Sequence, residues 1–322
     1  MAGLSEYLFV AGTVCLVIGF LLHVVHTTLL AAGRRSSAAL SFGRPLAGNT
    51  GTSTGTATMT LGGGSLPGGA TEGSATGSLS FRTSTTPGSI GIGMTWTGWI
   101  LVGAGMLIRA YIVGRGPWGN MYEFSVAFAF GIVGGYLFLQ RRYPIRTIGL
   151  VPIGVALFLL GYAATLPADI EPLVPALQNP PLITVHVAMA MISYGIFTVS
   201  FGAAVAYLIQ GTSDRFTWLP SHKVLDEVAY RAVIIGFPLF ATLIILGSYW
   251  ASIAWGAYWS WDPKETAALV TWLIYAVYLH SRNQKGWAGR PSALILVIGF
   301  GALMFTYFGN LFFAGLHSYS GL

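Results

Sequence analysis

The stretch YLFVAGTVCLVIGFLLHVVHTTLLA, residues 7–31, is an apolar run without an Asp, Glu, Lys or Arg side chain. An α-helix rises about 1.5 Å per residue, so a run of this length can cross a hydrocarbon core of about 30 Å. No basic stretch precedes the run, and it is longer than the apolar core of a secretory signal. We therefore expect a retained transmembrane helix.

The composition of the whole chain extends this interpretation. The 322 residues are 54% hydrophobic and only 8% charged, whereas about a quarter of the residues in soluble domains are charged. Apolar runs recur without the alternation of polar and apolar residues that marks a membrane-spanning barrel. We predict an all-α polytopic membrane protein with about eight transmembrane helices, near residues 7–31, 94–113, 121–140, 147–165, 183–209, 232–254, 265–281 and 292–315.

The distribution of basic residues predicts how these helices are oriented. Most of the 16 Arg and Lys residues follow the first, third, fifth and seventh predicted helices, as at 34–35, 141–146, 215–231 and 282–290. Cytoplasmic loops of membrane proteins carry an excess of Arg and Lys. We therefore expect this side to be cytoplasmic and both termini to be outside.

Residues 33–93 are dominated by Gly, Ser and Thr. Such a segment cannot bury enough apolar surface to offset its ordering entropy, and it lacks the G-K-[ST] sequence of a phosphate-binding loop. We expect a first transmembrane helix at 1–32, a disordered cytoplasmic linker at 33–93 and a seven-helix membrane domain at 94–322. Within that domain, the mixed-charge segment 219–231 has apolar residues at helical spacing, and we expect it to lie along the inner membrane surface.

The sequence WGAYWSWDPKE, residues 255–265, concentrates aromatic and charged residues after the sixth predicted helix. Tryptophan rings can stack on a flat ligand, although Trp and Tyr also gather at membrane interfaces without one. His186 and His317 are expected on the same outer face, and two imidazoles can clamp haem iron. The outer loop, taken as 250–265, and these two histidines form a candidate haem site.

Other histidines are expected on the inner side. His280 ends the seventh predicted helix, His23 and His26 lie in the inner part of the first, and His222 lies in an inner loop. The predicted depth of the histidines in the membrane therefore allows two ligand-binding sites, one outer and one inner. Cys15 is the only cysteine, so the chain has no CxxCH sequence and cannot carry haem covalently as a c-type cytochrome does.

The tryptophan-rich sequence resembles the WWD signature of haem-handling proteins in cytochrome c biogenesis, W-G-x-x-W-x-W-D-x-x-E. The matching residues are Trp255, Gly256, Trp259, Trp261, Asp262 and Glu265. Four other segments are also similar to family elements. They are GPWGNMYE at 116–123, LITVHVAMAMISYGIF at 182–197, YLHSR at 278–282 and GNLFFAGLHSYSG at 309–321. Together they favour the CcsA/ResC branch of the system II pathway.

The resemblance implies a ligand set. His186 and His317 would be axial ligands of a non-covalent haem b on the outer face, held against the tryptophan loop. His280 would be one iron ligand of a haem inside the membrane. The second ligand of that haem would come from a partner subunit of the CcsB/ResB type, and we do not assign it to His23 or His26.

The resemblance also implies an activity and a location. With its partner, the chain would export haem and attach it to the CxxCH of apocytochrome c, as part of a holocytochrome c synthase. Thioredoxin-like proteins that reduce the thiols would be further partners, together with membrane lipid but no nucleic acid. The setting would be the cytoplasmic membrane or the thylakoid membrane, with the attachment site on the outer or lumenal face.

Structural roles are expected for several residues near the candidate site. Asp262 is followed by proline, which is typical of an N-cap with proline at the first helical position, and Glu265 suits the first turn. Lys264 is expected at a solvated helix start. Asn120 is expected to cap the third helix. Arg115 has two interpretations that the sequence leaves open, a partner of a haem propionate or an ordinary interfacial arginine.

Two other functions fit parts of the pattern. A di-haem b-type electron carrier usually places paired histidines about 13 residues apart on one helix, whereas the first predicted helix has only His23 and His26. A transporter of another small solute predicts broken helices or internal repeats, and no convincing repeat is present. Both remain alternatives to haem handling.

Overall fold

The computed structural model describes residues 2–42, 86–170, 172–178, 180–282, 284 and 287–318. Within these ranges every regular element is helical. The α-helices are α1 Ala2–Phe42, α2 Thr86–Val113, α3 Met121–Gln140, α4 Leu150–Ala163, α5 Pro180–Gln210, α6 His222–Trp255, α7 Pro263–Ser281 and α8 Arg290–Phe308. Three short 3-10 helices accompany them, η1 Arg146–Gly149, η2 Pro175–Leu177 and η3 Gly309–Leu311.

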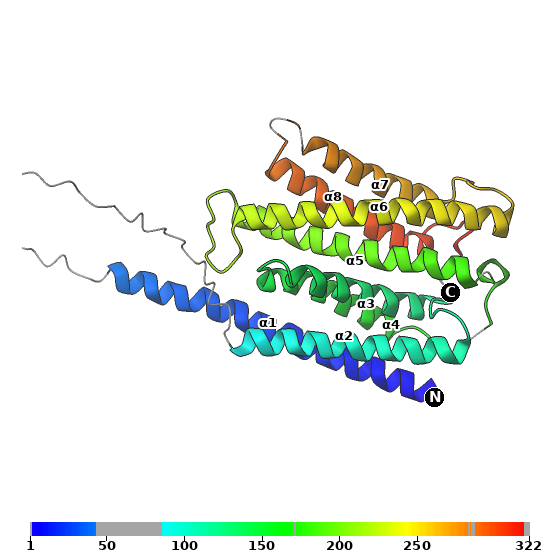
Figure 1. Ribbon diagram of the computed structural model, residues 1–322, viewed down its shortest axis with the longest axis horizontal. Helices are drawn as coiled ribbons and strands as arrows, with labels where there is room; N and C mark the ends of the chain where they lie inside the picture. The colour runs from blue at the N-terminus through cyan, green and yellow to red at the C-terminus, as the bar shows by residue number, and fades with distance from the viewer. Residues whose placement is uncertain are drawn as a thin grey trace, which may run out of the picture.

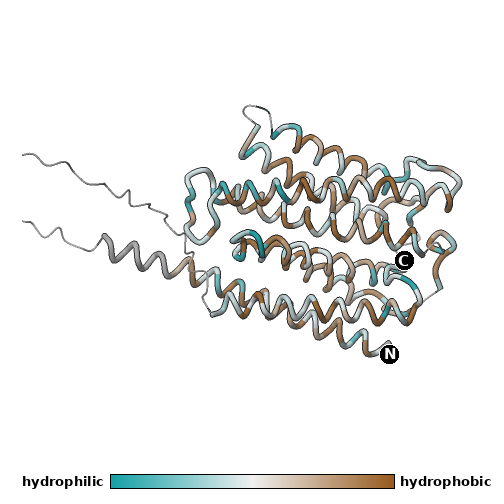
Figure 2. The backbone as a smooth tube through the Cα atoms, viewed as in Figure 1, coloured by the Kyte–Doolittle hydropathy of each residue, from teal (hydrophilic) through white to brown (hydrophobic). Residues whose placement is uncertain are grey.

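The helices run side by side as a single bundle (Figure 1). Helix α1 packs chiefly on α2, α3 packs on α4 and α5, α5 packs on α6 and α8, and α7 packs on α8 and α6. Hydrophobic residues extend along the middle of the bundle, and hydrophilic residues are more frequent toward its two ends (Figure 2). Seven of the described helical segments are long and apolar enough to cross a membrane. The predicted all-α polytopic membrane protein is confirmed.

The loops divide between the two ends of the bundle. One end of the bundle holds residues 114–120, residues 256–262, the segment after α8 and the start of α1 (Figure 1). We call this the site end, and it corresponds to the end that the basic residues predict to be outer. Helix α7 is not among the seven apolar segments, because it begins with Lys264 and Glu265 and is less hydrophobic, but it runs beside α6 and α8 like the others.

The predicted boundaries differ from the structure on both sides of the predicted linker. Helix α1 continues to Phe42 and α2 begins at Thr86, so residues 33–42 and 86–93 are helical. Residues 43–85 lie outside the described part of the chain. The glycines of 86–93 have a packing role, because a Cβ at Gly88 would come within 2.7 Å of His26, and one at Gly91 within 2.9 Å of His23.

The prediction that 219–231 lies along the membrane surface is wrong. Helix α6 begins at His222 and continues to Trp255 without a break. The apolar residues at helical spacing face the bundle, since Leu225 and Val228 are fully buried and the Ser200 hydroxyl of α5 donates to the Ala229 carbonyl.

The last predicted helix also ends earlier than expected. Helix α8 stops at Phe308 rather than near residue 315, and η3 follows it. Its C-cap residue is Gly309. The residues after η3 therefore do not continue along the axis of α8, and this allows residue 317 to reach the α6–α7 loop.

Helices α3 and α5 cross closely at the centre of the bundle. A Cβ at Gly195 would lie 2.2 Å from the Gly131 carbonyl oxygen, and one at Gly131 would lie 2.4 Å from the Met191 carbonyl oxygen. Both helices are more than half buried along their apolar windows. Small residues at such crossings let two backbones approach in a membrane.

We expect Gly195→Ala to lower the thermal stability of the detergent-solubilised protein, because the added methyl group would force the two backbones apart at a cost of about 1–3 kcal/mol. Gly301→Ala is the matched control, since a Cβ there meets no atom within 4 Å. The control should leave the unfolding temperature unchanged or raise it. Equal unfolding temperatures for the two variants would contradict the close crossing.

Candidate functional site

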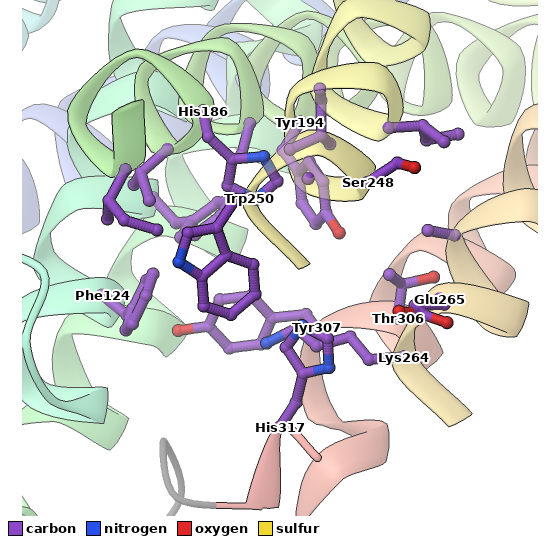
Figure 3. Close-up of a pocket in the computed structure, with 18 of the residues that line it drawn as sticks. Phe124, His186, Tyr194, Ser248, Trp250, Lys264, Glu265, Thr306, Tyr307 and His317 are labelled. Atoms are coloured by element: carbon purple, nitrogen blue, oxygen red, sulfur yellow. The ribbon is translucent and has the colours of Figure 1, made fainter. Parts of the chain in front are cut away.

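A large cavity opens at the site end of the bundle (Figure 3). It encloses about 1090 Å³ of space between atoms, a volume that includes open solvent at its mouth. Its walls come from α3, α5, α6, α7, α8 and the segment after α8. The lining includes His186, His317, Trp259, Glu265 and Lys264, among largely apolar side chains.

His186 enters the cavity from the first turns of α5 (Figure 3). Its ring packs against α6 where Gly247 provides room, since a Cβ there would lie 2.8 Å from Cε1 of the imidazole. The ring lies near the Leu243 carbonyl, yet Nδ1 has no hydrogen-bond partner of normal geometry among the described residues. A buried polar atom without a partner is costly in an apolar wall, which marks this imidazole as a candidate ligand-binding group.

His317 reaches the same cavity from the segment after α8. Its Nδ1 lies 2.8 Å from Oδ2 of Asp262, and the backbone N–H of Leu316 donates to Oδ1 of the same carboxylate at 2.5 Å. An imidazole that donates its Nδ1 proton to a carboxylate presents the lone pair of Nε2, the arrangement found for metal-binding histidines.

The charge states of this pair follow from its surroundings. Burial opposes ionisation of Asp262, but the hydrogen bonds from His317, Lys264 N–H and Leu316 N–H outweigh it and lower the pKa of Asp262 to about 2. Burial lowers the pKa of His317 below its ordinary value, although the hydrogen bond to Asp262 partly offsets this effect. At neutral pH the pair therefore consists of a carboxylate and a neutral imidazole.

Asp262 also caps helix α7, as the sequence predicts. Its side chain accepts a hydrogen bond from the Lys264 N–H at 3.0 Å, and Glu265 accepts from the Asp262 N–H at 3.2 Å, which completes a capping box. Glu265 also accepts from the Ser260 N–H at 2.9 Å. Both carboxylates of the tryptophan-rich sequence thus hold the loop in place.

The tryptophans of the loop take different positions. Trp255 ends α6 and contacts His317 edge-on, with ring centroids 4.8 Å apart. Gly256 caps the helix at φ +77°, a left-handed conformation that glycine adopts without steric cost. Trp259 lines the cavity, whereas the side chain of Trp261 is 69% exposed. The loop therefore offers one tryptophan as cavity wall and another at the surface.

Arg115 does not line the cavity. Its Nη1 lies 2.9 Å from Oε2 of Glu123, and Nε of Arg109 lies 2.7 Å from the other oxygen. The Gly119 N–H also donates to Glu123, at 2.6 Å. Asn120 caps α3 by accepting from the Glu123 N–H, as the sequence predicts. This buried cluster fixes the α2–α3 loop and directs Arg115 to a carboxylate of the protein.

Several lining residues were not predicted from the sequence. Trp250 is buried in α6 beside His317, with ring centroids 5.7 Å apart, and its indole N–H donates to the Ala176 carbonyl. Lys264 lines the cavity, although the sequence predicts a solvated position. Tyr194 and Tyr307 form the deeper wall. Trp250 lies at the start of the predicted outer loop, 250–265, but five residues before the motif, and nothing in the sequence singles it out from the rest of that loop.

The remaining histidines lie away from this cavity. His280 is exposed near the end of α7, where its Nε2 lies 3.1 Å from Nε2 of Gln284. His23 is buried between helices, with Nδ1 2.8 Å from the Gly19 carbonyl oxygen and Nε2 3.2 Å from the Tyr136 hydroxyl. His26 is buried on the same helix. Helix α1 packs on α2 and α4, so neither residue approaches His280.

The family model described as "Cytochrome C assembly protein" matches residues 118–317. The chain belongs to the cytochrome c assembly family. Relatives named "Cytochrome c biogenesis protein CcsA" are 34% identical over 261 residues in Pyropia yezoensis, covering 66% of this chain and 82% of the relative, and 37% over 235 residues in Mesostigma viride, covering 63% and 77%. The Synechococcus elongatus relative of that name is 35% identical over 272 residues, covering 68% and 82%.

These similarities support the CcsA branch that the tryptophan-rich sequence resembles. As a CcsA-family member, the chain is a multi-pass membrane protein with a role in cytochrome c biogenesis. That role implies haem handling and apocytochrome c as a partner. The matched residues begin just before α3 and end at His317, so they contain every residue that lines the cavity.

In this CcsA-family chain we expect Asp262→Ala to lower the free energy of unfolding by more than about 1 kcal/mol, the usual effect of losing an N-cap, because the hydrogen bonds from His317 and from the Leu316 N–H are lost as well. Asp262→Asn should keep most of the cap, because asparagine caps as well as aspartate. The folded state holds the pKa of Asp262 at about 2, below its ordinary 3.8. The stability that its charge provides is therefore complete above pH 3.8 and is lost as the pH falls toward 2.

Thermal unfolding of the three proteins between pH 2 and pH 7 checks both points. The wild type should lose more stability than Asp262→Asn between pH 4 and pH 2. Parallel pH profiles for the two proteins would rule out a charge interaction at this position.

Proposed function

We propose that this chain binds haem in the site-end cavity through His186 and His317 and presents it to the CxxCH sequence of apocytochrome c. It would do so with a membrane subunit of the CcsB/ResB type, as part of a cytochrome c synthase. The observation that carries the proposal is that imidazoles from α5 and from the segment after α8 line one cavity.

The residues that line the cavity suit haem in their chemistry. Haem b is a flat apolar ring with an iron centre and two carboxylates. The imidazole of His186 and the Asp262-supported imidazole of His317 provide nitrogen donors for the iron. Aromatic side chains such as Phe124, Trp250 and Trp259 line the cavity or pack beside it, and they provide flat apolar faces.

Asp262 would tune the iron ligand that it holds. A carboxylate behind a ligating histidine fixes its tautomer and raises its basicity, and loss of such a partner typically weakens metal binding about 10–100-fold. Two nitrogen ligands would also protect the iron and govern its redox state, which matters because ferric haem oxidises two thiols to a disulfide and is itself reduced to ferrous haem. Thioredoxin-like proteins would keep the apocytochrome thiols reduced.

The contribution of this chain to attachment would be positioning. Each cysteine thiol adds across a vinyl group of haem, forming a C–S bond while the thiol proton passes to carbon. Holding the reactants in attack geometry can supply several kcal/mol of such a barrier. The cavity opens at the end that the basic residues predict to be outer, which favours attachment on the outer or lumenal face of a cytoplasmic or thylakoid membrane.

His280 would bind haem at a separate inner site. It lies at the opposite end of α7 from Asp262 and is exposed on the side of the bundle, where a partner subunit could provide the second ligand. The histidines of α1 are poor candidates, because both ring nitrogens of His23 already make hydrogen bonds within the chain. The same bonds disfavour the alternative of a b-type electron carrier that uses α1.

We expect His186→Ala and His317→Ala each to reduce haem retention at least tenfold and to abolish cytochrome c maturation, because each removes an iron ligand. Added imidazole should partly restore both properties. The measurements are the Soret spectrum of the purified protein and the yield of covalent cytochrome c. His222→Ala is the control, since His222 pairs with Asp214 at the other end of the bundle. Normal maturation by both ligand variants without imidazole would refute the outer site.

We expect His280→Ala to leave haem bound at the outer site intact when haem is added to the purified complex. It should lower the haem content of the complex purified from cells that supply haem from the cytoplasm. Haem spectra of the complex before and after reconstitution separate these effects. Unchanged haem content before reconstitution would show that His280 has no part in delivery.

A further inference from the structure

We propose that Lys264 binds a propionate carboxylate of the haem in the site-end cavity and thereby fixes the rotation of the porphyrin within its own plane. This inference rests on the proposed function and adds an orienting residue to it. Lys264 stands between Asp262 and Glu265, at a position where the tryptophan-rich signature leaves the residue open.

The side chain of Lys264 lies inside the cavity rather than in solvent. It starts from the first turn of α7 and lies beside Tyr307 and His317 (Figure 3). Its Nζ reaches a point 5.9 Å from the centre of the Phe124 ring on α3. The ammonium group therefore projects across an aromatic cavity from one wall toward the opposite one.

No carboxylate in the described part of the chain forms an ion pair with this ammonium group. The neighbouring Asp262 accepts hydrogen bonds from His317 and from two backbone N–H groups. Glu265 accepts from the backbone N–H groups of Ser260 and Asp262. Both carboxylates are thus engaged by the loop.

The basic groups that compete for a propionate are engaged elsewhere. Arg115 and Arg109 both bind Glu123, and the Nη2 of Arg109 also donates to the Ala168 carbonyl at 2.7 Å. Neither arginine lines the cavity. Of the described residues that line the cavity, Lys264 alone is a lysine or an arginine.

An unpaired ammonium in an apolar cavity calls for a counterion. Removing a charge from water is costly unless it is paired, and a hydrogen bond between ammonium and carboxylate is among the stronger polar contacts in proteins. The propionates of haem occupy one edge of the porphyrin and the vinyl groups lie toward the other. A propionate held at Lys264 would therefore turn the vinyl edge away from α7.

The test compares haem with its dimethyl ester, in which both carboxylates are masked while the iron and ring are unchanged. Binding to the purified full-length chain is followed by the Soret band in wild type, Lys264→Gln and Lys264→Arg. Wild type and Lys264→Arg should bind haem roughly tenfold or more tightly than the ester, as expected for one charge-assisted bond. Lys264→Gln should lose this preference and should bind the ester as wild type does. Lys223→Gln, at the opposite end of the bundle, is the charge-matched control.

The outcomes separate this inference from the proposed function. A wild-type spectrum without two-imidazole coordination for either porphyrin would overturn the haem site and this inference with it. A normal two-imidazole spectrum in all variants, with an unchanged preference for haem in Lys264→Gln, would overturn the role of Lys264 alone. Equal affinity of wild type for haem and ester would do the same. Ester binding by Lys264→Gln also shows that the variant is folded.

Discussion

The carboxylate of Asp262 joins the parts of the chain that form the site. It caps α7, accepts from the Leu316 N–H and holds His317 through Nδ1. Residues from the α6–α7 loop and from the segment after α8 are thereby fixed on one side chain. Gly315 makes this approach feasible, because a Cβ there would lie 2.2 Å from Oδ1 of Asp262. The cavity depends on this interaction, since His317 has no helix of its own to position it.

A second buried carboxylate organises the other side of the same end. Glu123 binds two arginines and a backbone N–H and so fixes the α2–α3 loop. That loop carries Trp118, which packs in one cluster with Leu177, Ile183 and Trp250. Trp250 contacts His317 in turn. Charged side chains inside a membrane bundle are costly, and here their role is to hold the rim of an aromatic cavity.

The tryptophan-rich sequence therefore has a structural role as well as a place in the cavity wall. Gly256 ends α6, and Asp262 with Glu265 starts α7. Between them, Trp259 lines the cavity while Trp261 is exposed at φ +59°. A non-glycine residue with positive φ is uncommon and is maintained by its surroundings. Trp261 is thus a solvent-exposed tryptophan of this loop.

The sequence by itself determined the membrane class, the succession of helices and the two caps at Asn120 and Asp262, because hydrophobic length and cap chemistry are local properties. It also placed His186 and His317 at one end of the bundle, since each spanning helix reverses the direction of the chain. It failed at the edges of the predicted linker, where residues 33–42 and 86–93 are helical, and Gly88 and Gly91 serve close packing against α1. Only the tertiary structure decided that Arg115 turns to Glu123 while Lys264 enters the cavity. Each residue lies in or next to a loop at the site end, and the partner of each depends on which helix packs beside it.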